Sequence, residues 1–299
     1  MLTARGYIPI PPHTPGAFDH ADVYHASGRV YVANSSAGTV DVLDGPGATH
    51  LATIAGCPDA SGVLCAQKDG LVFAAARATG NLLVLNAGDG TLRRTIGVGQ
   101  SPNGLAWDSL RKRVLVADVT DNQARLLDPY TGNTLATAPL PGRPRWCVYD
   151  SFSDRFLVNI REPSLVQWLA TETLELGDTI SVPSDGPHGL EVDAIPQRAY
   201  VATDARQLVA LDLVKGSVAG TQDLSGPPDA IWLNPQRHVL YSATGDPGAV
   251  DVLDIRTLNR LATVPTERGA HTLTFDPQRQ RLYVFLPESS RAAIFEEVE

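Results

Sequence analysis

"GPHGLEVD", residues 186–193, places a histidine directly after a proline and just before apolar and polar residues begin to alternate. Such alternation is typical of a β-strand with one buried face. Six other stretches align with this one, and five of the seven have a proline directly before the residue aligned with His188. The six are FDHADVY (18–24), CPDASGVL (57–64), SPNGLAWD (101–108), RPRWCVYD (143–150), PPDAIWLN (227–234) and GAHTLTFD (269–276). The chain is therefore built from seven copies of one unit.

The residue aligned with His188 recurs at a nearly constant interval. Successive aligned positions are 39 to 44 residues apart. Self-similarity at this period, with four short strands in each unit, is typical of a β-propeller. We therefore predict an all-β, seven-bladed β-propeller in a single domain, with four-stranded antiparallel blades. The aligned residues are His20, Asp59, Asn103, Arg145, His188, Asp229 and His271.

Further strand-like stretches follow the first one in each unit. In different units RVYVAN (29–34), AVDVLD (249–254) and RLATVPT (260–266) exemplify the second, third and fourth strands. The seventh unit reaches Glu299 before its fourth strand, so we expect residues 3–11 to complete that blade and remove a free sheet edge. The predicted blades span approximately residues 17–56, 57–99, 100–142, 143–184, 185–226, 227–267, and 268–299 with 3–11.

Composition excludes several classes of partner. The formal net charge of -9 argues against nucleic acid, because an acidic surface repels a phosphate backbone. No apolar run approaches the roughly 18 residues that span a bilayer. The N-terminal stretch has no apolar signal core, so we expect a cytoplasmic protein. The three cysteines form no CxxC pair and are expected to be buried thiols. A closed ring has no open edge, so we expect a monomer.

The recurrent RVYVAN and AVDVLD stretches, the FDH opening and the period of about 42 residues resemble the bacterial YVTN or YncE-like family of seven-bladed propellers. The resemblance covers essentially the whole chain and implies the fold. More distantly, the chain resembles the gluconolactonase (SMP-30-like) hydrolases and the streptogramin lyases, which use a divalent metal at the axial mouth. The histidine-rich ring departs from the Glu, Asn and Asp ligands of the gluconolactonases, so neither metal nor substrate carries over.

The aligned residues should converge at one mouth of the central channel, where each first strand begins. His20, His188, Asp229 and His271 come from consecutive blades, and imidazoles with one carboxylate suit a divalent metal. We predict zinc there, with Mn, Fe, Co, Ni or Ca as alternatives. On the opposite side, Arg145 would hold negative charge and Asp59 would manage a proton.

Two further residues, Asn103 and Trp146, are predicted to contact a ligand, with packing between blades as the alternative for Trp146. These residues together suggest metal-dependent hydrolase or lyase chemistry on a small anionic or ester- or lactone-like molecule. The alternative is a non-catalytic propeller that binds a protein or a ligand, its polar ring being only a solvated channel lining. The sequence alone leaves both classes open.

Overall fold

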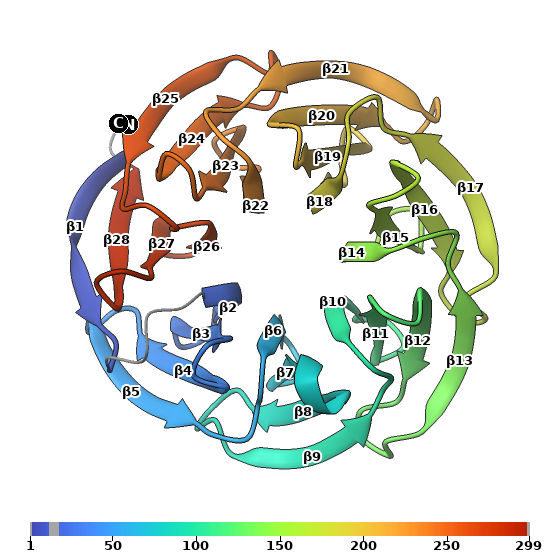
Figure 1. The fold of residues 1–299 in the computed structure, drawn as a ribbon, viewed down its shortest axis with the longest axis horizontal. Helices are drawn as coiled ribbons and strands as arrows, with labels where there is room; N and C mark the ends of the chain where they lie inside the picture. The colour runs from blue at the N-terminus through green and yellow to red at the C-terminus, as the bar shows by residue number, and fades with distance from the viewer. Residues whose placement is uncertain (1, 12–17, 298–299) are drawn as a thin grey trace.

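A computed structural model describes residues 2–11 and 18–297 of the protein, and it confirms the predicted all-β, seven-bladed propeller. Seven four-stranded antiparallel sheets stand around a central channel, with the first strand of each blade innermost (Figure 1). Among the described residues the only helix is the three-residue 3₁₀ turn η1 (Arg77–Thr79). In this part of the chain no helix is long or apolar enough to cross a membrane.

The strands follow one another along the chain within each blade. The first two blades contain β2 (Phe18–Tyr24), β3 (Arg29–Asn34), β4 (Thr39–Asp44), β5 (Thr49–Ile54), β6 (Ala60–Ala66), β7 (Leu71–Ala76), β8 (Asn81–Asn86) and β9 (Leu92–Gly97). Blades three and four contain β10 (Pro102–Asp108), β11 (Arg113–Asp118), β12 (Gln123–Leu127), β13 (Thr134–Pro139), β14 (Pro144–Asp150), β15 (Arg155–Ile160), β16 (Leu165–Ala170) and β17 (Leu176–Ser181). Blades five and six contain β18 (Pro187–Asp193), β19 (Arg198–Thr203), β20 (Gln207–Asp212), β21 (Ser217–Asp223), β22 (Pro228–Asn234), β23 (Val239–Thr244), β24 (Ala249–Asp254) and β25 (Arg260–Pro265). Blade seven contains β26 (Thr272–Asp276), β27 (Arg281–Leu286), β28 (Arg291–Glu297) and β1 (Leu2–Pro9).

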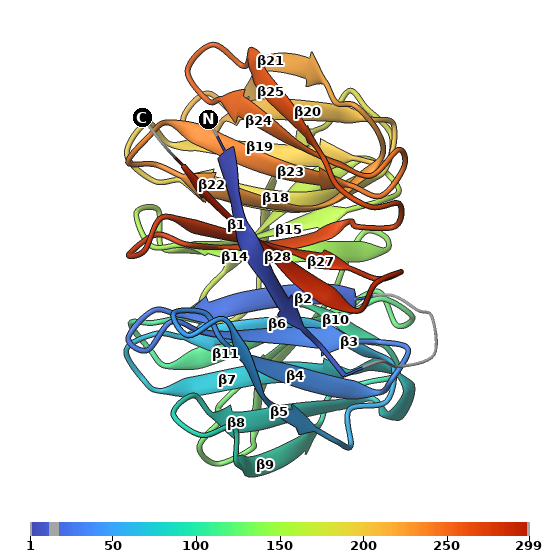
Figure 2. The same ribbon diagram turned by 90° about the vertical axis from the view of Figure 1, so that its left-hand side faces the viewer.

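The ring closes as predicted, because β1 pairs with β28 as the outer strand of blade seven. Figure 2 shows β1 lying along β28 on the outside of the molecule. Ile8 of β1 is fully buried in a cluster that contains Phe18 of β2 and Phe285 of β27. The closing strand therefore packs against blade one as well as blade seven.

The core lies between neighbouring blades. The second strands are almost fully buried, as in β3, whereas outer strands such as β5 are largely exposed. Tyr31 of β3 and Val72 of β7 share one buried cluster, so each sheet covers the face of the next. Each fully buried side chain of this size stabilises the fold by about 2 kcal/mol relative to its exposed state.

The turn between the first and second strands has the same backbone in every blade. Its last residue has a positive φ in all seven: Gly28, Gly70, Lys112, Asp154, Gln197, His238 and Gln280. In blade three, Asp108 accepts hydrogen bonds from the turn N–H groups of Leu110 and Arg111 at 2.9 and 3.0 Å. Asp276 does the same in blade seven. These Asx-type bonds explain why an aspartate ends so many of the first strands.

A β-bulge interrupts the first strand of six blades at the same place. Register shifts fall between Phe18 and Ala21, Ala60 and Val63, Pro102 and Leu105, Pro144 and Cys147, Pro187 and Leu190, and Pro228 and Ile231. A bulge takes residues out of the ladder and re-aims their side chains. In these six blades, two residues of the first strand therefore leave the hydrogen-bonded ladder, and their side chains lie at one mouth of the channel.

Candidate functional site

The bulges define which residues are structurally equivalent at this mouth. The first bulge residue of the six blades is, in order, Asp19, Ser61, Asn103, Arg145, His188 and Asp229. In blade seven, His271 immediately precedes β26 and holds the equivalent place. The predicted alignment is therefore right at five positions and wrong at two, since His20 lies one residue too late and Asp59 two residues too early.

His188 lies between two carboxylates. Its Nδ1 is 3.0 Å from Asp204 Oδ1, and its Nε2 is 2.7 Å from Asp229 Oδ1, an ion pair in which the ring N–H is poorly aligned with the oxygen. Burial alone would lower the pKa of His188, but Asp229 and Asp204 outweigh it and raise the pKa to about 9. His188 is thus an imidazolium at neutral pH.

Asp229 is the point on which the three histidines converge. Burial would raise its pKa, but His188, then His271 and His20, hold the pKa of this carboxyl far below its ordinary value. His271 Nε2 lies 3.6 Å from Asp229 Oδ2, and the His271 side chain is 29% exposed. Of the predicted set, His188 and His271 therefore lie against Asp229, whereas the Nε2 of His20 lies 3.4 Å from Asp19 and acts on Asp229 only through its charge.

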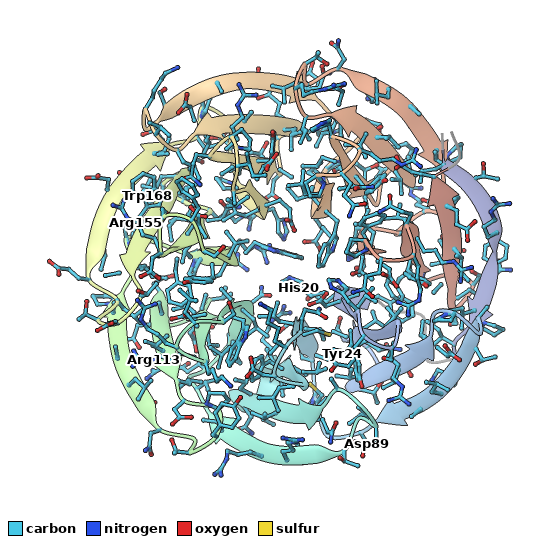
Figure 3. The ribbon with its side chains drawn as sticks, turned by 180° about the vertical axis from the view of Figure 1, so that it is seen from behind. His20, Tyr24, Asp89, Arg113, Arg155 and Trp168 are labelled. Carbon is cyan, nitrogen blue, oxygen red and sulfur yellow. The ribbon has the colours of Figure 1, made fainter. Side chains whose placement is uncertain are left out.

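His20 and Trp146 occupy the second bulge position of blades one and four. Three other blades have glycine there, Gly62, Gly104 and Gly189, where a Cβ would collide with a backbone carbonyl of the next blade. His20 and Trp146 instead extend into the channel and stack, with ring centroids 3.9 Å apart (Figure 3 shows His20 at the channel). Because blades one and four are not neighbours, this stack spans the channel and forms a floor beneath the ring. Burial lowers the pKa of His20, although Asp19 opposes the shift.

Arg145 has no ion-pair partner among the residues that the structure describes. Burial lowers the pKa of its guanidinium, Arg143 and Arg161 add to the lowering, and Asp229 and Asp204 oppose it without outweighing it. Its Nε is buried without a hydrogen-bond acceptor in the described parts of the chain. A desolvated cation beside two other arginines is unfavourable unless an anion accompanies it.

The remaining predicted residues differ in their surroundings. Asn103 is buried, and no described group bonds its Oδ1. Asp59 is 43% exposed, has a left-handed backbone, and faces Arg77 at 3.5 Å. Asp59 therefore lies outside the ring of bulge residues, because the bulge of blade two lies between Ala60 and Val63.

Three charged residues of this mouth were missed from the sequence. Arg77, Arg161 and Asp204 each follow directly after a second strand, β7, β15 and β19. Antiparallel pairing brings the end of the second strand beside the start of the first, so these positions face the ring. Arg161 binds Asp204 through Nε and Nη2, both at 2.7 Å, and Arg77 Nη2 lies 3.0 Å from Asp19. A charge directly after the second strand of a unit was the available signal.

As placed, the ring does not fit a divalent cation. Nε2 of His188 already faces Asp229, and both ring nitrogens of His188 lie beside carboxylates, which favours a proton over a metal. Within residues 2–11 and 18–297, no group of three or more His, Cys, Asp or Glu side chains is arranged to hold a metal ion. Binding of zinc or its alternatives stays a prediction.

The comparisons with known proteins bear on the fold of the chain and not on its function. No family model matches the chain, and no curated protein matches it. Among solved structures, a chain of "Crystal Structure of Mitotic Checkpoint Complex" has a TM-score of 0.84 at 11% identity, over 99% of this chain and 92% of that one. Because 1757 chains of solved structures match, such likeness identifies no particular activity. The comparisons thus establish that the chain is similar in fold to many solved structures.

Proposed function

We propose that the protein binds a small molecule through a carboxylate or phosphate group at the ring mouth of the channel, with Arg145 as the main contact. The observation that carries this proposal is the guanidinium of Arg145, which is largely buried and forms no ion pair or Nε hydrogen bond with a described residue, although Asp229 and Asp204 act on it from farther away. A planar guanidinium matches the geometry of both anions.

Two of the other cations near this mouth already have partners among the described residues. Arg161 is held by Asp204, and His188 by Asp204 and Asp229. A cavity of about 680 Å³ lies beside them, and its lining includes Arg143, Arg161 and Asp204. This volume accommodates a small organic ligand. Arg145 is not part of that lining, so in this proposal the body of the ligand occupies the cavity and only its anionic group extends beyond it to Arg145.

His271 supports hydrolysis of an ester or lactone as the accompanying chemistry. It is the more accessible of the two histidines on Asp229, and that carboxylate orients and stabilises an imidazolium. In this proposal His271 removes a proton from water, and the hydroxide adds to the carbonyl carbon while Arg145 holds the anionic group of the ligand. Collapse breaks the bond to the alkoxide, which takes the proton back from His271.

Arg145→Gln tests the proposal. Benzoate and inorganic phosphate, titrated by calorimetry, should bind the wild type, and the variant should lose about tenfold or more in affinity, as expected for one charge-assisted contact. Because the substitution removes a desolvated charge with no described partner, its free energy of unfolding should stay equal or rise by about 1 kcal/mol. Arg93→Gln, on an exposed outer strand, is the matched control.

Two results would contradict anion binding at Arg145: equal affinity in Arg145→Gln, or no anion binding to the wild type. Zinc titration addresses the metal predicted from the sequence. If zinc raises the free energy of unfolding of the wild type but not that of the His188→Ala, His271→Ala double variant, the ring binds a metal and the anion-binding proposal is wrong. Turnover of an ester and lactone panel then tests the chemistry. We also propose that the chain is related to the YVTN or YncE-like propellers, a relation that concerns its fold and not its activity.

A further inference from the structure

A second cavity, of about 420 Å³, lies inside the channel on the far side of the His20–Trp146 stack. Its lining comes from the first strands β2, β6, β10, β14, β18 and β22 and from the turns that follow them, including Gln67 and Ser109. His20 and Trp146 line it as well, whereas Arg145, His188, Asp229 and His271 do not. It is therefore a compartment separate from the ring mouth, and it opens toward the opposite one.

Aromatic side chains form much of its wall. Trp107, Trp146 and Trp232 come from blades three, four and six, and Tyr149 lies beside them in the lining. Trp146 also packs against two buried clusters, one between blades four and five and one between blades six and seven. The faces of indole rings attract cations, and several rings around one space make this attraction large.

Two carboxyl groups occupy the same level of this compartment. Three first strands have a residue that pairs with an equivalent tyrosine on the neighbouring second strand. The pairs are Asp22 with Tyr31, Glu191 with Tyr200, and Trp232 with Tyr241. Asp22 is occupied, since it accepts hydrogen bonds from the N–H groups of Val23 and Cys65, both at 2.7 Å. Glu191 lines the cavity, and no described residue offers its carboxyl a hydrogen bond or an ion pair.

We propose that this compartment binds a small organic cation of the ammonium type, with Glu191 as its counter-ion and Trp107, Trp146 and Trp232 as its walls. The compartment holds a carboxyl with no described partner, and three indole rings share its lining. The basic groups in that lining are His20, whose pKa burial lowers, and the exposed Lys68, and neither forms an ion pair with Glu191 in the described residues. A ligand ammonium supplies the missing charge and contacts the aromatic faces. This site is independent of the anion site at the ring mouth.

Proton linkage gives the proposal a signature. Burial, followed by the neighbouring Asp22, raises the pKa of Glu191 to about 8, so the group is largely neutral at pH 7. The other titratable groups lining the compartment are His20, Asp22, Cys65, Lys68, Cys147 and Tyr149. Of these, Asp22 has its pKa raised to about 7 by burial, so it is about half ionised at pH 7 and fully ionised by pH 8.5. Because the cation binds the ionised carboxylate, binding releases a proton at neutral pH, and affinity rises as pH approaches and passes the pKa of Glu191.

Choline and its neutral isostere 3,3-dimethyl-1-butanol are the probes, titrated calorimetrically into the full-length protein. Choline should bind saturably, at least about tenfold more tightly than the alcohol, and about 25-fold more tightly at pH 8.5 than at pH 6.5. Titration in two buffers of different ionisation enthalpy should show release of close to one proton. Glu191→Gln should lose the preference for choline and the pH dependence, and Trp232→Leu should weaken choline binding while keeping the proton release.

Glu175→Gln, on an exposed segment of blade four, is the matched control and should bind choline as the wild type does. Equal binding of choline and the alcohol, unchanged choline affinity in Glu191→Gln, or no choline binding at either pH would each overturn the proposal. Arg145→Gln separates the two sites: it should weaken benzoate binding about tenfold or more and leave choline binding intact, whereas Glu191→Gln should weaken choline binding and leave benzoate binding intact.

Discussion

Replacement of Asp229 by asparagine is expected to lower the free energy of unfolding by about 3 kcal/mol at pH 7, as expected when one member of a buried ion pair is removed. The carboxylate lies 2.7 Å from His188 and 3.6 Å from His271. Asparagine keeps the shape but removes the charge, so the imidazolium of His188 retains only Asp204. Urea unfolding followed by tryptophan fluorescence measures the loss.

The loss should depend on pH in a defined direction. The pKa of His188 is raised to about 9, above its ordinary value near 6.5. The stability contributed by this pairing is therefore complete below about pH 6.5 and disappears as pH rises through about 9. The difference between wild type and Asp229→Asn should shrink accordingly between pH 6.5 and 10.

Asp178→Asn, on the exposed outer strand β17, is the matched control and should change stability by less than about 0.5 kcal/mol. A double-mutant cycle with His188→Gln should give a coupling energy above about 1.5 kcal/mol. A loss below 1 kcal/mol, or one that is constant from pH 6.5 to 10, would show that the ion pair does not stabilise the fold.

Ile8→Ala should cost about 3 to 4 kcal/mol, because it removes a fully buried side chain from the strand that closes the ring. Ile8 pairs opposite Ala292 on β28 and packs in the cluster shared by blades seven and one. Thermal and urea unfolding measure the loss. We also expect faster aggregation on heating, since a loosened β1 exposes the edge of β28.

Tyr7→Ala provides a control one residue away on the same strand. The Tyr7 side chain is 51% exposed, and its ring contacts the Arg291 guanidinium at 4.5 Å from the centroid. Its loss should cost about 1 kcal/mol or less. If Tyr7→Ala is as damaging as Ile8→Ala, the cost comes from the strand as a whole and not from the buried contact with blade one.

The sequence predicts the architecture well because the repeat is a property of the whole chain. Seven copies at a 42-residue period and one missing fourth strand are sufficient to infer both the blade number and the closure by the N-terminal strand. The structure confirms both features. Small errors of alignment within one unit do not affect this inference.

The ring was harder to predict because its residues sit in bulges. A two-residue bulge is invisible to counting along alternating strands, so His20 and Asp59 were assigned to places held by Asp19 and Ser61. Asp204 and Arg161 come from second strands, which the alignment of first strands does not include. The raised pKa of Glu191 comes from burial inside the channel and from Asp22 of blade one, which no single unit of the repeat reveals.

Closure of the ring by β1 also determines how the molecule comes apart. In an open array of repeats the end units have one neighbour each and can melt first, so unfolding proceeds by fraying. Here every sheet has two neighbours, since β1 joins blade seven to blade one. Loss of any one blade uncovers two apolar faces at once, which makes partly melted rings costly. The protein should therefore unfold in a single cooperative transition despite its repetitive sequence.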